Sequence, residues 1–138
     1  MNIGNNIHEV FNLKNIEEIR QIFKNDRFAT LNGAVIDEVC ENFAKCSLVV
    51  TDNHRNAVGG VMFMLADFAF AVAANHDVMN TVSISSNIAF VGVCKGTKLI
   101  ATAKCLKAGK STCYYNISVC DELENLVCEV NITGFKKS

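Results

Sequence analysis

The 138-residue chain contains no proline, no C-x-x-C pair among its cysteines and almost no net charge. Because proline removes a backbone N–H from a strand ladder, its absence is compatible with a chain built largely of paired strands. The formal charge of -1 argues against sequence-blind binding to nucleic acid, which needs a concentrated positive face, and no such face is visible in the sequence. Half of the residues are apolar and a fifth are charged, which excludes a disordered or collagen-like chain.

Seven cysteines are present, but their number is odd and their spacing is irregular. This pattern argues against a disulfide framework or a zinc site, and we predict no bound metal. The first residues, Met1–Asn6, lack the basic and apolar regions of a secretory signal. We therefore expect a cytoplasmic protein whose thiols stay reduced and pack as small apolar side chains in the core.

The length favours one compact domain, because two cores would each bury too little apolar surface to offset chain entropy. We expect an N-terminal segment over residues 1–14 and a single domain over 15–138. Apolar residues recur at helical spacing over 15–24, with acids in the first turn after a cap at Asn15. The residues 25–27 and 31–33 are interpreted as breaks.

One later run is apolar on every side, since Asp67 is the only polar residue between Val61 and Ala74. Such a helix either spans a membrane or is enclosed by other elements. A run of about 14 to 16 residues rises only about 21–24 Å, less than a hydrocarbon core of about 30 Å. A central aspartate would also cost roughly 2.5–3.5 kcal/mol in a membrane. We therefore predict no membrane partner and a helix buried inside the protein.

Strand-like runs flank this helix. Two precede it, in 34–40 and 44–50, and four follow it, in 81–90, 98–106, 111–120 and 126–135. Several alternate polar and apolar residues, as expected of an antiparallel sheet with one covered face. The order of elements predicts an α+β fold in which an antiparallel sheet wraps around one central apolar helix, preceded by a short N-terminal helix. An unpaired edge of this sheet favours at least a homodimer.

Asp67 is the first candidate for chemistry, because an ionised carboxylate in an apolar helix is costly unless it is paired or reached by water. It could contact a neighbouring loop or a partner chain, or it could act as a base or nucleophile. Gly59 and Gly60 directly precede the apolar run. They could merely permit a tight loop, or their N–H groups at a helix start could bind an oxyanion. Gly60 and Asp67 are about two turns apart, so both could border one cavity.

Residues 59–71, GGVMFMLADFAFA, resemble the start of the central helix in hotdog-fold acyl-CoA thioesterases of the PaaI type, in the 4-hydroxybenzoyl-CoA thioesterase superfamily. The run VSISSNIAF at 82–90 resembles the strand after that helix. Residues 96–103 and 107–111 resemble the next two strands and their turn. The resemblance spans roughly residues 16–135. It implies a hotdog fold and hydrolysis of a small or aromatic acyl-CoA, at a site shared by two chains of a homodimer or of a dimer of dimers.

The resemblance also implies roles for individual residues. Asp67 would activate water or attack the thioester carbonyl, while Gly59 and Gly60 would donate backbone N–H groups to the carbonyl oxygen. Ser83 would help to position the water. No separate cofactor is implied, because coenzyme A is part of the substrate. The turn that would contact the coenzyme A phosphates contains Lys107, Gly109, Lys110 and Ser111.

The loop before the glycines departs from the family pattern, which has His or Gln where this chain has Val58. Asn53 would match the family's asparagine if the loop has lost about one residue, whereas Asn56 would require a loss of about four. His54 is interpreted as an exposed loop residue rather than as a replacement acid or base.

Two other functions stay open. The altered loop is compatible with a hotdog protein that binds acyl-CoA without hydrolysing it. A hotdog hydratase or dehydratase usually relies on an Asp and His pair, and no histidine of this chain is placed for that role.

Overall fold

The computed structural model describes residues 14–54 and 58–138, so the predicted N-terminal segment over 1–14 lies outside the described residues except for Lys14. The helices are α2 (Ile16–Phe23), α3 (Arg27–Leu31) and α4 (Val58–Asn75), with a 3₁₀ turn η1 (Asp52–His54) before α4. The strands are β1 (Val35–Cys40), β2 (Phe43–Val49), β3 (Thr81–Phe90), β4 (Lys98–Ala108), β5 (Thr112–Asp121) and β6 (Leu126–Lys136).

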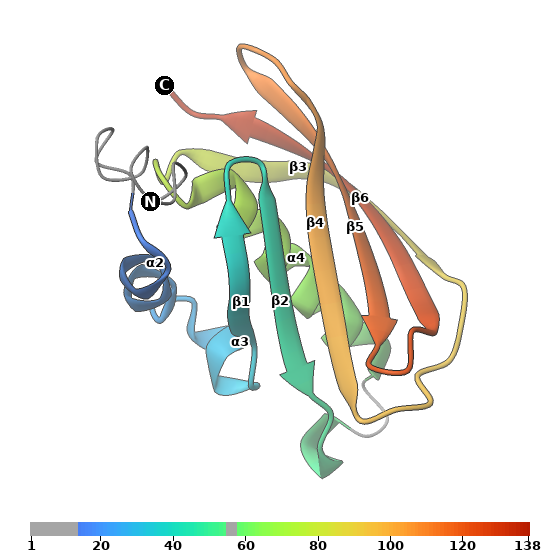
Figure 1. Ribbon diagram of the computed structural model, residues 1–138. Coiled ribbons are helices and arrows are strands. Elements are labelled where there is room, and N and C mark those ends of the chain that lie inside the picture. The colour runs from blue at the N-terminus through green and yellow to red at the C-terminus, as the bar shows by residue number, and fades with distance from the viewer. Residues whose placement is uncertain (1–13, 55–57) are drawn as a thin grey trace, which may run out of the picture.

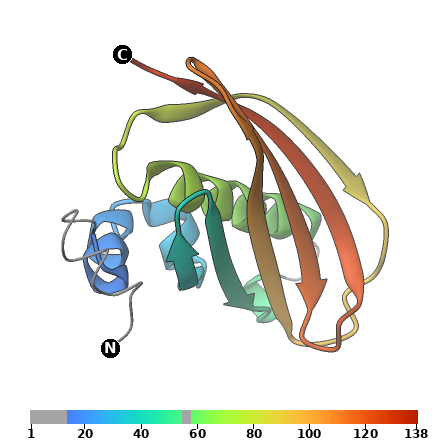
Figure 2. The ribbon, with the colours of Figure 1, turned by 45° about the horizontal axis from the view of Figure 1, so that its top comes forward.

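The six strands form one sheet in the order β1-β2-β4-β5-β6-β3, and every neighbouring pair is antiparallel. The sheet wraps around α4 (Figure 1), and β4, β5 and β6 arch over the helix in the second view (Figure 2). This confirms the predicted α+β fold with an antiparallel sheet around one central helix. Each strand boundary lies within two residues of its predicted position.

The predicted N-terminal helix and its cap are confirmed. The Asn15 side chain accepts a hydrogen bond from the backbone N–H of Glu18 at 2.9 Å, and Ile19 and Phe23 are buried. The sequence predicts no helix between the two breaks that follow, but the chain forms α3 there. Five residues are too few to display an apolar period, so propensity gave no signal. The break after α3 is real, because Gly33 has a φ of +101°, a conformation that favours glycine.

α4 is enclosed, as its composition predicts. It is long and apolar enough to cross a membrane by length and composition, yet most of its side chains are buried inside the protein. Phe70 packs edge-on against Tyr115 of β5 with ring centroids 5.3 Å apart. Small residues of β2 and β4, such as Ala44 and Ala101, are fully buried and allow the helix to lie close to the sheet.

Three of the cysteines pack in the strands as predicted, since Cys46, Cys113 and Cys128 are buried, whereas Cys40 is exposed. All seven are free thiols. Burial raises the pKa of the Cys128 thiol to about 11, so this sulfur is protonated at neutral pH. In the part of the chain that the structure describes, no three Cys, His, Asp or Glu side chains gather where they could hold a metal ion.

β3 forms an open edge of the sheet. It follows α4 in the chain but pairs only with β6, and most of its side chains are exposed. These include the apolar side chains of Ile84 and Phe90, which are 59% and 58% exposed. A long edge strand that presents apolar groups and free backbone positions is a template for pairing with another chain.

Candidate active site

One stripe of α4 is less covered than the rest of the helix. Half-buried or exposed residues recur along it at intervals of three and four: Gly60, Phe63, Asp67, Ala71 and Ala74. Residues with this spacing lie on one face of a helix. The fold thus places Gly60 and Asp67, two candidates from the sequence, on the same open stripe of the central helix.

Asp67 is the only charged residue of α4, and no hydrogen bond or ion pair holds its carboxylate within the described residues. Burial raises the pKa of Asp67 above its ordinary value, and the charge of Asp26, in the turn between α2 and α3, raises that pKa further. A partly desolvated carboxylate without a partner is a stronger base than one in water. Sequence patterns could not identify Asp26 as a neighbour, because the two residues meet only through the tertiary fold.

Gly59 and Gly60 lie in the first turn of α4, whose N–H groups have no acceptor inside the helix. Gly59 lines an open pocket of about 340 Å³, together with Met62 of α4 and Phe90 at the end of β3. A Cβ atom at Gly59 would meet the Phe90 ring at 3.5 Å, whereas one at Gly60 would meet nothing within 4 Å. A carbonyl oxygen entering at this end of the helix can therefore approach the backbone.

Asn53 and His54 occupy η1, the turn before α4. Asn53 is exposed and lines a different pocket, beside the end of α3 and β2. His54 is 4% exposed, so its interpretation as an exposed loop residue is wrong. Its Nδ1 accepts a hydrogen bond from the Thr51 N–H at 3.0 Å, and its Nε2–H donates to the Asn32 carbonyl at 3.0 Å. The Nε2 bond ties η1 to the end of α3, and the Nδ1 bond closes the turn itself. Asn56 lies outside the described residues.

Ser83 lies towards the opposite end of α4 from the glycines. β3 starts beside the end of the helix, where the Asn75 amide donates to the Thr81 carbonyl at 3.0 Å and accepts from the Thr81 N–H at 2.8 Å. The strand then runs back along α4 and reaches Gly59 with Phe90. Ser83 is exposed, and no hydrogen bond joins it to Asp67 within the residues described.

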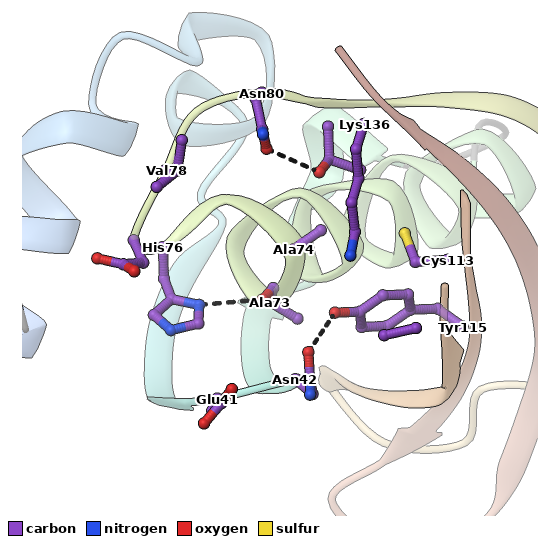
Figure 3. A pocket seen from close by; sticks show the side chains of 13 residues that line it. Glu41, Asn42, Ala73, Ala74, His76, Val78, Asn80, Cys113, Tyr115 and Lys136 are labelled. Atoms are coloured by element: carbon purple, nitrogen blue, oxygen red, sulfur yellow. Dashed lines mark hydrogen bonds between the residues drawn. The ribbon is translucent and has the colours of Figure 1, made fainter. Parts of the chain in front are cut away.

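The predicted phosphate-binding turn, 107–111, also lies at the far end of α4. Lys107, Lys110 and Ser111 are exposed, and the Gly109 carbonyl accepts a hydrogen bond from Lys136 Nζ at 3.0 Å. Lys136 lines a pocket of about 330 Å³ with the last turn of α4 and the turn between β1 and β2 (Figure 3).

Figure 3 shows the polar groups of this far pocket. His76 Nδ1 is hydrogen-bonded to the Ala73 carbonyl at 3.0 Å, and the Tyr115 hydroxyl donates to Asn42 Oδ1 at 3.5 Å. These groups are separated from the glycines by most of the length of α4, about 27 Å for 18 residues. The chain therefore has one pocket at each end of the helix, a largely apolar one beside the glycines and a polar one at the far end, with Asp67 between them.

The arrangement suits attack on a carbonyl group. A carboxylate of raised basicity can supply a nucleophile, and backbone N–H groups at a helix start can bind the oxygen that becomes negative. No metal is needed for either role, and the walls of the open pocket near Gly59 are largely apolar.

The family model described as "Thioesterase superfamily" matches residues 54–128. A protein of Archaeoglobus fulgidus is 34% identical over 127 residues, which are 88% of this chain and 82% of that protein. The acyl-coenzyme A thioesterase PaaI of Escherichia coli K12 is 32% identical over 111 residues, covering 77% of this chain and 79% of PaaI.

Solved structures agree with these sequence matches. The structure of the E. coli PaaI protein, from the phenylacetic acid degradation operon, has a TM-score of 0.78 at 28% identity and covers 86% of this chain and 89% of PaaI. A Streptococcus pneumoniae protein solved with coenzyme A has a TM-score of 0.72 at 19% identity, covering 84% of this chain and 99% of its own. At that identity the second likeness shows the fold alone.

Proposed function

The chain belongs to the thioesterase superfamily and has its hotdog fold, and from this premise we propose that it hydrolyses an acyl-coenzyme A thioester to a free acid and coenzyme A. The observation that carries the proposal is the unpartnered Asp67 carboxylate on the open stripe of α4, whose pKa is raised by burial. Coenzyme A enters the reaction as part of the substrate, as it does for the thioesterase PaaI that this chain resembles.

Asp67 can act in two ways. As a base it takes a proton from water while the water oxygen bonds to the thioester carbonyl carbon; the C–S bond then breaks, and the thiolate of coenzyme A takes up that proton. As a nucleophile its oxygen bonds to the carbonyl carbon and releases coenzyme A, and water then hydrolyses the resulting anhydride. In both routes Gly59 and Gly60 stabilise the oxyanion, while Asn53 and Ser83 orient the carbonyl and the water.

Helix geometry supports a site shared by two chains. Gly60 and Asp67 are seven residues apart, so about 10 Å separates them along α4. The N–H groups of the first turn point away from Asp67, towards the helix start, which increases the gap to an oxygen bound there. One carbonyl group cannot contact both residues of the same chain. The Asp67 that attacks is therefore supplied by a second copy.

The edge strand β3 offers a way to bring that copy into place. Two copies related by a twofold axis pair the same edge with itself, and such a pair is antiparallel. The partner's α4 then runs in the opposite direction, so its Asp67 approaches the glycines of the first chain. Its turn with Lys107 and Lys110 is likewise carried towards that end, where it can contact coenzyme A phosphates.

The first test is the hydrolysis of a panel of acyl-coenzyme A esters by the purified protein, measured as the release of free thiol. We expect turnover by the natural chain and a loss of about 10²–10⁴-fold in kcat for Asp67→Ala. Asp77→Asn, which changes an exposed acid just after α4, is the matched control and should keep full activity. Equal rates for the natural chain and Asp67→Ala would remove Asp67 from the mechanism.

Gly60→Ala tests the role of the backbone at the helix start. A Cβ atom there meets nothing within 4 Å in the chain, and alanine favours a helix more than glycine does, by up to about 1 kcal/mol. The variant should therefore fold at least as stably as the natural chain. If a substrate carbonyl approaches Gly60 closely, kcat/KM should still fall by tenfold or more.

A non-catalytic acyl-coenzyme A binding protein is the alternative. It is favoured by Val58, a half-buried aliphatic residue at the first position of α4, which offers the carbonyl no hydrogen bond. Tight binding of coenzyme A esters without release of thiol would support this alternative. Turnover by the purified protein would exclude it.

A further inference from the structure

Two carboxylates from different elements lie near each other beside the open stripe of α4. Asp67, in the middle of the helix, has no hydrogen bond or ion pair within the described residues. Asp26, in the turn between α2 and α3, is half-buried, and its carboxylate has no such partner in the described part of the chain either. Like charges in a place that water reaches poorly repel each other, and here no cation separates them.

The turn that bears Asp26 is held against α4 at the position next to Asp67. Phe23, the last residue of α2, packs edge-on against Phe68, with ring centroids 6.0 Å apart and planes at 88°. Phe68 is buried and directly follows Asp67 in α4. The Asp26 N–H donates to the Phe23 carbonyl at 3.0 Å, and the Asp26 carbonyl accepts from the Thr30 N–H at 3.1 Å and from the Thr30 hydroxyl at 2.9 Å. The backbone of residue 26 is therefore fixed on both sides.

The Asp26 side chain does not make the hydrogen bond that its position offers. It is the N-cap residue of α3, where an aspartate usually accepts a hydrogen bond from an N–H group of the first turn. No such bond is present in α3. The carboxylate instead lies close enough to Asp67 for the two charges to interact. A rigid backbone and a side chain that does not cap its own helix leave the charge of Asp26 to act on Asp67.

Asp26 is the one charged group in the described part of the chain that alters the pKa of Asp67. The Arg20 guanidinium of α2 is already occupied, by an ion pair with Glu17 and by two hydrogen bonds to the Ile36 carbonyl, from Nε at 3.1 Å and Nη2 at 2.8 Å. The other charged side chains of α2, α3, β1 and the turn after α2 are exposed: Glu18, Lys24, Arg27, Asp37 and Glu38.

The titratable groups of the remaining elements are neutral or distant in the sequence from the middle of α4. Among the buried residues of the strands only Asp121, at the end of β5, is charged, and loop N–H groups bind its carboxylate. His54 precedes α4 and His76 follows it. Burial raises the pKa of three thiols and one phenol of the strands, which are therefore neutral at pH 7: Cys46, Cys113, Cys128 and Tyr115.

We propose that Asp26 is a positioning residue for the reaction: the turn between α2 and α3 holds its charge beside Asp67 and thereby makes Asp67 a stronger base or nucleophile. The inference rests on the proposed hydrolysis of acyl-coenzyme A and adds a second carboxylate to its site. Burial has the larger effect on the pKa of Asp67, and the charge of Asp26 adds to it. Both residues belong to one chain, so they enter a site shared by two copies together.

The dependence of kcat/KM on pH tests this role, because it reports the pKa of the group that must be ionised in the free enzyme. Asp26→Asn removes the repulsion, which lowers the pKa of Asp67. We expect the acidic limb of the profile to move to lower pH. On the alkaline side kcat/KM should fall by less than about tenfold, because the base is weaker but still present. The ratio of variant to natural activity therefore decreases as the pH rises, whereas a ratio independent of pH would overturn the inference.

Asp77→Asn is the matched control. It removes an exposed acid just after α4 and changes the net charge of the chain by the same amount as Asp26→Asn. Its pH profile should be that of the natural chain. An equal displacement of the profile in both variants would assign the effect to net charge and would also overturn the inference. Thermal unfolding verifies that both variants are folded.

A double-mutant cycle measures the interaction from stability alone. Asp26→Asn relieves repulsion only when Asp67 is charged, so we expect its effect on Tm at pH 7 to be more favourable in the natural chain than in Asp67→Asn. The loss of a negative charge at the start of α3 is common to both backgrounds and cancels in the comparison. Equal changes of Tm in the two backgrounds would mean that the carboxylates do not interact.

A titration of the free protein separates this inference from the proposed function. The side-chain carboxyl signal of Asp67 is followed by ¹³C NMR as the pH is varied, and it is identified by its absence from Asp67→Asn. We expect its midpoint at lower pH in Asp26→Asn than in the natural chain, and no change in Asp77→Asn. An unchanged midpoint in Asp26→Asn would refute the inference even if the protein hydrolyses thioesters. A displaced midpoint without turnover would instead refute hydrolysis and leave the interaction of the two carboxylates established.

Discussion

At the scale of single residues, Asp67 carries a conflict between stability and chemistry. Burial raises its pKa in the folded chain above the unfolded value. The protonated Asp67 side chain therefore stabilises the folded chain fully below the unfolded pKa of about 3.9. This stabilisation is lost as the pH rises through the folded pKa. Asp67→Asn removes the buried charge, so we expect a higher Tm than that of the natural chain at pH 7.

The difference in Tm between these two proteins should shrink as the pH falls, because both side chains are then neutral. Thermal unfolding followed by circular dichroism at neutral and acidic pH measures it. A lower Tm for Asp67→Asn at pH 7 would mean that the carboxylate stabilises the fold.

His54 has a structural role that can be measured. His54→Ala leaves the Asn32 carbonyl and the Thr51 N–H without their partner, in a place that water reaches poorly. Since a buried polar group left unpaired costs roughly 1–3 kcal/mol, we expect the free energy of unfolding to fall by about 2–4 kcal/mol. Urea unfolding provides the measurement. His76→Ala, which removes one hydrogen bond of a half-buried ring, should cost less than half as much.

The spacing of residues in the sequence indicated some of the candidate site and missed other parts. The interval between Gly60 and Asp67 predicted that both face the same way, because it depends only on helix geometry. The burial of His54 was not predictable, since its partner Asn32, at the end of α3, is 22 residues away and meets it only in the tertiary fold. Asp26 was missed for the same reason: its effect on Asp67 arises from tertiary packing.

At the scale of elements, the loops at one end of the sheet are joined by a carboxylate. Asp121 accepts hydrogen bonds from the backbone N–H groups of Lys95 and Gly96, at 2.9 and 3.1 Å, and from those of Leu123 and Asn125, at 3.0 and 2.9 Å. It thereby ties the loop between β3 and β4 to the turn between β5 and β6. These hydrogen bonds hold the pKa of Asp121 well below its usual range, and the bond from the Asn125 side chain has the largest effect.

Asp121→Asn should loosen this end of the sheet, because an amide NH₂ replaces an acceptor that faces N–H donors. The pKa of Asp121 is lower in the folded chain than in the unfolded chain. The ionised carboxylate therefore stabilises the fold above the unfolded pKa, and this stabilisation is lost as the pH falls through the folded pKa. We expect the Tm of this variant to be several degrees lower than that of the natural chain at pH 7. We also expect its Tm to change less with pH in the acidic range. An unchanged Tm at pH 7 would contradict a structural role for the carboxylate.

The strands were predictable because their alternation reports one covered face, as in β5, where Cys113, Tyr115, Ile117 and Val119 all point to α4 and are buried. The pairing of the strands was not, since alternation contains no information on which edge joins which. α3 was missed because a single helical turn that buries only Ala29 and leaves Phe28 and Leu31 exposed shows no apolar period in the sequence.

At the scale of the whole molecule, a shared site predicts complementation between two inactive chains. Asp67→Asn and Gly60→Val would each be inactive alone. A mixed dimer contains one site in which both defects meet and one site that is intact. After the chains are mixed and exchanged, half of the dimers are mixed, so about a quarter of the natural activity should return.

Analytical ultracentrifugation of the same samples gives the oligomeric state that this outcome requires. Ile84→Asp places a charge on the exposed β3 edge and should lower both the dimer fraction and the recovered activity. If stable mixed dimers form but show no activity, Asp67 and Gly60 of the same chain must belong to one site.

The position of β3 also affects how the chain can be made. β3 is synthesised directly after α4, but the strand it pairs with, β6, is synthesised only after β4 and β5. During translation β3 therefore has no neighbour in its own chain while about 35 further residues are added, at roughly 5–20 residues per second. Throughout that interval its apolar side chains are available to a nascent neighbour on the same messenger RNA. Assembly of two copies can thus begin before either chain is complete, and a chain shortened by loss of β6 would expose both edges of β3.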